Sequence, residues 1–98
     1  MPTYLALHKH NTEGAQSIKQ LPERLEQATQ LADSMDCEVE YFLVNGYYDS
    51  AVIVDAPDEQ TAKQLELAVS GTGTVTTEFQ RAWDDSELEE LTEEIPEP

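Results

Sequence analysis

Two histidines and one aspartate are the residues of this chain best suited to chemistry. His8 and His10 are separated by one residue in an alternating stretch, so on a strand they project to the same side. Asp49 immediately precedes a second, strongly apolar stretch. A histidine that a carboxylate orients in a partly apolar cavity can act as a general base. We therefore take His8 and Asp49 as the candidate catalytic pair, with His8 as base and Asp49 as the orienting carboxylate.

The same residues allow other interpretations. Aspartates commonly accept hydrogen bonds from turn amides, so Asp49 could instead stabilise the turn at residues 45–48, with His8 exposed or at an interface. Two histidines and a carboxylate also form a recognised metal set, but His-x-His on a strand often arises by chance. The single cysteine, Cys37, can form neither an intramolecular disulfide nor a multi-thiolate zinc site. We expect no metal site and no cofactor.

Alternating and helix-period stretches predict the elements that position these residues. Period-two patterns indicate strands, and apolar residues three and four apart indicate helices. A proline inside the first helical pattern, Pro22, predicts a short turn before the main helix, because proline is tolerated at a helix start and not in its interior. In chain order we expect a strand at Thr3–Lys9, a loop at His10–Gly14, a turn at Ala15–Gln20, a helix from Pro22 or Glu23 to Ser34, strands at Glu38–Val44 and Tyr48–Asp55 joined by a tight Asn45-Gly46 turn, a helix capped by Asp58 and ended at Gly71–Gly73, and a strand at Thr74–Trp83.

This βαββαβ order predicts an α+β, ferredoxin-like fold, with a four-stranded antiparallel sheet and both helices on one face. The first strand then lies between the third and the fourth. Strand parity assigns one group of residues to the helix-free face, and with it a candidate ligand cavity. That group comprises Tyr4, Ala6, His8, His10, Asp49, Ala51 and Ile53, and the cavity residues are Tyr4, His10, Tyr48 and Glu78. An apolar sheet face without a cover indicates a partner, and a homodimer of paired sheets is the simplest arrangement.

Charge is the strongest signal in the composition. The 98 residues include 21 acids and 5 bases, which gives a net charge of −16. Such a surface repels nucleic-acid phosphates and anionic lipid, so neither is an expected partner. The acidic excess extends over the body as well as the tail, which is typical of proteins that work at high salt, where charge repulsion is screened. With no secretory leader and no membrane-spanning run, we expect a cytoplasmic protein.

The last fifteen residues form a separate acidic segment. We place the domain at 1–83 and the tail at 84–98, which holds eight acids and no bases. Asp84 followed by Glu87 has the pattern of a capping box, and Leu88, Leu91 and Ile95 form a thin apolar stripe. The tail is therefore either a frayed end or a short helix that docks on the body or on a second subunit.

Several short motifs, taken in order, resemble the GYD-domain family. They are Pro2-Thr3-Tyr4, Ile18–Arg24, Gly46-Tyr47-Tyr48-Asp49 continuing into Ser50–Asp58, and Thr77-Glu78 continuing to Arg81-Ala82-Trp83. The resemblance covers Met1 to about Trp83. It implies the dimeric α/β barrel superfamily, in which two ferredoxin-like sheets close around a shared cavity, and it implies no settled activity.

Two functions follow as hypotheses. The first is a homodimeric small-molecule-binding or interaction module without catalysis. The second is a cofactor-independent oxygenase- or isomerase-like enzyme, in which His8 and Asp49 act on a small organic substrate.

Overall fold

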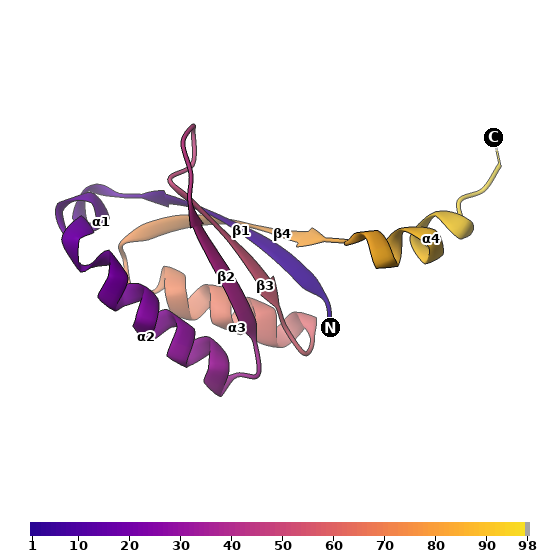
Figure 1. Cartoon of the computed structure of the whole chain (residues 1–98), viewed down its shortest axis with the longest axis horizontal. Helices are drawn as coiled ribbons and strands as arrows, with labels where there is room; N and C mark the ends of the chain where they lie inside the picture. Colours follow the sequence, from indigo (N-terminus) through magenta and orange to yellow (C-terminus); the bar gives the residue numbers. More distant parts are fainter. Residues whose placement is uncertain (98) are drawn as a thin grey trace.

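The computed structural model describes residues 1–97 and shows one sheet, a helix layer and an extended tail (Figure 1). A central sheet is formed by four strands, and helices follow the first and third of them. The elements are β1 (Thr3–His10), α1 (Thr12–Gln16), a 3₁₀ turn (Ile18–Gln20), α2 (Leu21–Ser34), β2 (Glu38–Leu43), β3 (Ser50–Asp55), α3 (Glu59–Ser70), β4 (Val75–Ala82) and α4 (Asp85–Glu93).

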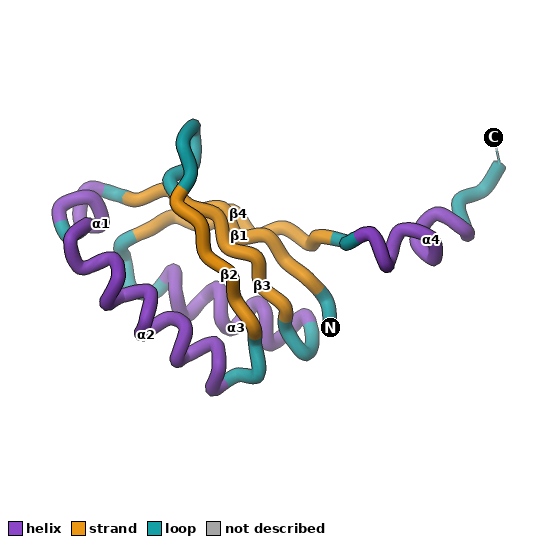
Figure 2. The backbone as a smooth tube through the Cα atoms, in the orientation of Figure 1, coloured by secondary structure: helices purple, strands orange, loops and turns teal. Residues whose placement is uncertain are grey.

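The sheet confirms the predicted ferredoxin-like topology. Its strand order is β2-β3-β1-β4, and every neighbouring pair is antiparallel. The continuous apolar run of β3 lies between β2 and β1, as expected for a strand that is apolar on both faces. Helices α2 and α3 lie together on one side of the sheet, and the other side has no helix over it (Figures 1 and 2).

The assignment of β1 residues to the two faces was wrong for Tyr4, Ala6, His8 and His10. Tyr4, Ala6 and His8 are buried beneath the helices, and His10 lines the space on that same side. The register pairs Leu5 with Ile53 and Leu7 with Ala51, so the helix-free face carries the leucines of β1. Ala51 and Ile53 do lie on the helix-free face, as predicted. Alternation along a strand shows which of its residues share a face, but it does not show which face the helices cover. In this chain they cover the face of β1 that carries the small residue Ala6.

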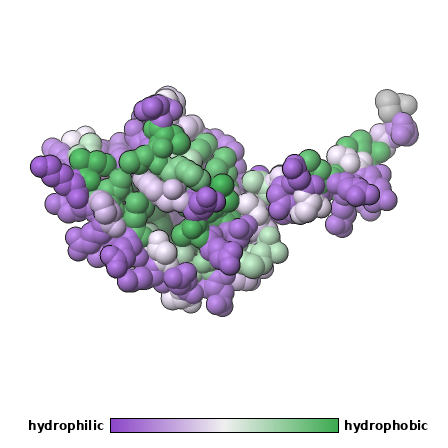
Figure 3. All heavy atoms as spheres, in the orientation of Figure 1, coloured by the Kyte–Doolittle hydropathy of each residue, from purple (hydrophilic) through white to green (hydrophobic). Residues whose placement is uncertain are grey.

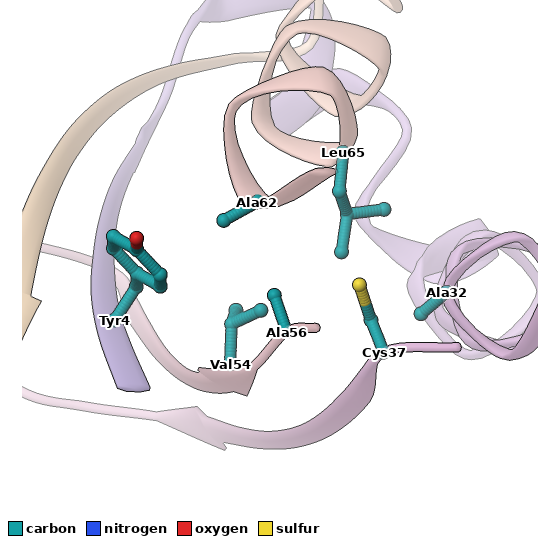
Figure 4. Close-up of a cluster of buried hydrophobic side chains, with 7 residues drawn as sticks. All are labelled: Tyr4, Ala32, Cys37, Val54, Ala56, Ala62 and Leu65. Atoms are coloured by element: carbon teal, nitrogen blue, oxygen red, sulfur yellow. The ribbon is translucent and has the colours of Figure 1, made fainter. Parts of the chain in front are cut away.

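The buried core is small and lies at one end of the sheet. Three alanines, Ala32, Ala56 and Ala62, have no exposed surface and bring α2, α3 and the end of β3 close together. Tyr4, Cys37, Val54 and Leu65 complete the cluster, and the Cys37 thiol points among them (Figure 4). Small side chains let helices approach closely, and Ala32 of α2 and Ala62 of α3 both belong to this cluster.

The first loop contains an extra helix. The segment predicted as a loop from His10 to Gly14 contains the last residue of β1 and the first three residues of α1, which runs on to Gln16. The N-cap of α1 is Asn11, with its side-chain oxygen 2.9 Å from the Gly14 nitrogen. The Asn11 amide also donates to the Gly73 carbonyl at 2.5 Å, so α1 is tied to the chain just before β4. Short polar caps of this kind satisfy the free amides of a first helical turn.

The β2–β3 connection is longer than the predicted two-residue turn. Bent chain runs from residue 45 to 49, and the Val44 amide donates to the Asp49 carbonyl at 3.0 Å. Gly46 has a φ of 126°, which a residue with a side chain rarely adopts. The start of α2 matches its prediction more closely, since Pro22 lies in the first turn of the helix.

The acidic tail forms a helix that extends away from the body (Figure 2). Helix α4 begins at the predicted capping box, in which Asp84 and Glu87 each bond the other's backbone amide. It has no buried residue, and Leu88, Leu91 and Ile95 are all exposed. An ion pair of 3.0 Å between Arg81 and Glu87 fixes its first turn to the end of β4. The tail therefore leaves the open side of the sheet uncovered.

Candidate functional site

A cavity lies on the helix side of the sheet. It has a volume of about 430 Å³, and residues of α2, of α3 and of the sheet line it. Apolar residues surround a hollow between α2 and β2 in the space-filling view (Figure 3). Its apolar walls come from both helices and from all four strands, and they include Leu25, Ala28, Val39, Val52, Leu65, Val69 and Phe79.

Three polar side chains on the helix side of the sheet stand out from this apolar lining. His8 is 9% exposed and lines the cavity, and it lies directly opposite Ser50 in the β1–β3 register. The hydroxyl of Ser50, and that of the cavity residue Tyr41, are buried and have no hydrogen-bond partner within residues 1–97. Because a buried hydroxyl without a partner costs stability, the Tyr41 hydroxyl indicates a place in the cavity where a bound molecule is favoured. Ser50 lies next to the cavity residue His8 and is not itself part of the lining.

The environment of His8 keeps its imidazole neutral. Burial is the main cause that lowers the pKa of His8 below its usual 6.5, and the nearby His10 lowers it further. The carboxylate of Glu66 opposes these effects, but Lys63 pairs with it at 3.0 Å. A neutral histidine presents one nitrogen that donates a hydrogen bond and one that accepts, which suits the recognition of an uncharged polar group.

The structure does not join the two residues of the predicted catalytic pair. Asp49 accepts a hydrogen bond of 2.8 Å from the backbone amide of His10, and its own amide donates to the His8 carbonyl. Across the described chain no hydrogen bond links the side chains of His8 and Asp49. The carboxylate is thus used by the backbone, although its partner is β1 and not the neighbouring turn. A general-base role for His8 stays a prediction.

Tyr4 lies in the core and not in the cavity wall. Its ring stacks on Phe79 with centroids 5.0 Å apart and planes 8° apart. The guanidinium of Arg81 lies 5.7 Å from the Tyr4 ring and 4.7 Å from that of Trp83. The phenol is 6% exposed and belongs to the buried cluster. Tyr4 therefore holds the ring of Phe79 in place by stacking on it, and Phe79 in turn lines the cavity.

The other two predicted cavity residues meet on the open face. Tyr48 donates a hydrogen bond to the carboxylate of Glu78, reaching from the β2–β3 loop to β4. This bond raises the pKa of Tyr48 and lowers the pKa of Glu78. Beside them, Lys9 donates to the Tyr47 carbonyl at 3.0 Å and lies 4.4 Å from its ring centre. These contacts form a polar rim at one end of the open face, on the far side of the sheet from His8.

The structure also bears on metal binding and on the reactivity of the single cysteine, Cys37. Within residues 1–97, no group of three or more histidine, cysteine, aspartate or glutamate side chains is placed to hold a metal ion. Burial, with Asp36 second and Asp58 third, raises the pKa of the Cys37 thiol. The thiol is 2% exposed, so it is shielded from both substrates and oxidants.

Sequence reasoning missed Tyr41 and Glu66 as cavity residues, and it missed Ser50 as the buried neighbour of His8. Ser50 carried a usable signal, because it is the one hydroxyl at the start of the apolar strand Ser50–Asp55. Tyr41 and Glu66 carried none, since a tyrosine in a strand and a glutamate in a helix are ordinary in those places.

The antiparallel sheet with two covering helices and a cavity between the layers defines a ferredoxin-like α+β domain. The GYD domain family matches residues 4–92, and the chain belongs to this family. The match continues past Trp83 and takes in most of α4, so the tail helix lies within the family's own boundaries. Neither curated proteins nor solved structures gave a match to the chain. None of the helices in the part described has the length and apolarity to span a membrane.

Proposed function

We propose that the protein is a homodimeric small-molecule-binding module, without catalysis, that works in the cytoplasm of a cell with high internal salt. The observation that carries this proposal is that both sides of the sheet carry apolar surface that the chain itself does not fill or cover. One side, under the helices, leaves a cavity for a ligand. The other side has an apolar patch open to solvent, which a second copy could cover.

The open face supports pairing with a second copy. Its centre is formed by Leu5, Leu7, Phe42, Ala51 and Ile53, of which Phe42 is 45% and Ile53 36% exposed. Polar side chains surround this centre, including the Tyr48–Glu78 pair at one end. An apolar core with a polar rim is the anatomy of a protein interface.

The exposed helix of the tail also supports pairing with a second copy. Helix α4 leaves the body at β4, the edge strand, and the residues of its apolar stripe remain exposed. Two copies that pair through their open faces would each place such an arm beside the other's body. The apolar stripe of this otherwise acidic helix could then pack against the surface of the second copy.

The cavity supports ligand binding. Its volume lies within the ~300–1,000 Å³ of ordinary small-molecule sites, and its lining is mostly apolar with a few converging polar groups. Helix and strand side chains form its walls, so the cavity is preformed. Because it lies on the covered side of the sheet, each subunit would hold its own site, independent of the open face.

Light scattering coupled to size-exclusion chromatography in molar KCl tests the assembly. We expect the mass of a dimer for the native chain and that of a monomer for Leu7→Glu, because a charge at the centre of the interface opposes burial. Gln60→Glu, an exposed position of α3 with the same change in charge, is the matched control and should remain dimeric. A native chain that stays monomeric at every concentration would overturn the proposal.

A further inference from the structure

We propose that the cavity between the helices and the sheet binds an uncharged, mostly apolar ring compound that presents a hydroxyl or carbonyl oxygen to Tyr41. This inference rests on the small-molecule-binding role proposed above and names the chemistry of the ligand. The cavity walls, the two unpartnered hydroxyls and the charge of the chain each restrict that chemistry.

The walls select an apolar body. Leucine, valine and alanine side chains from α2 and α3 face valines of β2 and β3 across the cavity. Phe79 adds an aromatic surface, and its stacking on Tyr4 fixes the ring in position. A rigid aromatic wall of this kind favours a flat ring over a flexible chain, because ring–ring contact adds stabilisation beyond the area it buries.

The hydroxyls select one polar group on that body. The Tyr41 hydroxyl is buried, lines the cavity with its side chain, and lacks a partner in the described part of the chain. A ligand oxygen that accepts its hydrogen bond would restore the interaction that burial removed. The neutral His8 also lines the cavity and can add a donor or an acceptor, and Ser50 lies beside it on the neighbouring strand without a partner of its own.

Charge excludes ions of either sign. A ligand anion would approach a chain of net charge −16, with the Glu66 carboxylate already at the cavity wall. Arg24 also lines the cavity, but its guanidinium already donates to the carbonyl and hydroxyl of Ser17. A cation would have to shed its water among apolar side chains, and the carboxylate that could compensate it is already paired with Lys63. An uncharged molecule avoids both the repulsion that an anion meets and the loss of hydration that a cation meets.

Three naphthalene probes test the proposal by isothermal titration calorimetry on the full chain in molar KCl at neutral pH. They are 2-naphthol, naphthalene and 2-naphthoate, which share a ring system and differ in carrying a hydroxyl, nothing or a carboxylate. We expect 2-naphthol to bind most tightly, naphthalene more weakly and 2-naphthoate not at all. Tyr41→Phe should weaken 2-naphthol about tenfold, to the level of naphthalene, and leave naphthalene unchanged, since one hydrogen bond is lost.

A second pair of variants locates the probes. Ala28→Phe fills the cavity from α2 and Val69→Phe fills it from α3, so either variant that keeps the native circular dichroism should abolish binding of both uncharged probes. The inference is overturned if no probe binds, if Tyr41→Phe leaves 2-naphthol unaffected, if 2-naphthoate binds as well as 2-naphthol, or if the filled variants still bind. The mass of the particle in light scattering is measured on the same samples, so loss of the dimer and failure of the ligand chemistry are read separately.

Discussion

His8 lies directly opposite Ser50 in the β1–β3 ladder, and both side chains lie on the helix side of the sheet. The pairing places the imidazole of a cavity residue beside a small buried hydroxyl. Ser50 is fully buried and His8 nearly so, which leaves little of the imidazole open to bulk solvent. This environment favours the neutral form of the histidine. Protonation of His8 should therefore lower the stability of the fold.

The pH dependence of unfolding should report the burial of His8. Its pKa in the folded chain lies below 6.5, so the unfolded chain binds a proton more readily and the stabilisation present above pH 6.5 is lost as the pH falls through the folded pKa. We expect the native chain to lose stability relative to His8→Gln between about pH 7.5 and about pH 5. Urea unfolding of both chains in molar KCl measures the difference, in which the carboxylates shared by the two chains cancel. A difference that is constant with pH would contradict the prediction.

Gly14 should be sensitive to the smallest substitution. A Cβ at this position would overlap the carbonyl oxygen of Thr74, a backbone atom that cannot move without disturbing the start of β4. We expect Gly14→Ala to cost about 2 kcal/mol of unfolding free energy, in the range of overpacked sites. Glu13→Ala, an exposed position in the same helix, should change stability by less than about 0.5 kcal/mol. Equal effects of the two variants would show that the close approach is not rigid.

The order of strands and helices could be read from the sequence because each depends on local chemistry. Pro22 fixed the start of α2, and Asp58 and Asp84 capped helices with side chains that reach a few residues along the chain. The apolar run after Ser50 identified the central strand. These signals act within one element, so no knowledge of the packing was needed.

The candidate site was harder to predict because it depends on which face of the sheet the helices cover. In β1 the larger apolar residues, Leu5 and Leu7, suggest a core face, yet the helices cover the side with Tyr4, Ala6 and His8. That choice is made by the fit of Ala32 and Ala62 against the sheet, a contact between elements distant in sequence. Once the face was misassigned, His8 and Asp49 seemed able to meet.

Salt should stabilise the chain by screening its acidic surface. The net charge of −16 repels itself most strongly in dilute buffer, and the Debye length falls to about 3 Å in molar salt. We expect the thermal midpoint to rise from about 0.1 M to about 2 M KCl. Glu26→Gln removes one exposed carboxylate of α2, away from the open face, so it should raise the midpoint at low salt and have little effect at high salt. A midpoint that does not respond to KCl would remove the basis for high-salt adaptation.

Removal of the arm should weaken the proposed dimer and spare the fold of the body. Helix α4 buries none of its residues in its own subunit, so a chain that ends at Trp83 should keep the native circular dichroism of the sheet and of α2 and α3. If the stripe of Leu88, Leu91 and Ile95 packs on the second copy, truncation should raise the dimer dissociation constant at least about tenfold, equivalent to about 1.4 kcal/mol.

A single substitution separates packing of the arm from its charge. Leu91→Ser in the full chain should reproduce much of the weakening, because it removes an apolar side chain and leaves every carboxylate in place. Glu90→Ser removes a charge from the same helix and should leave the dimer intact or slightly stronger, since it lowers repulsion between two acidic chains. Sedimentation equilibrium of both variants in molar KCl gives the dissociation constants. If Leu91→Ser and the truncated chain dimerise as tightly as the native chain, the arm does not reach the partner, and the open sheet face alone must hold the two copies together.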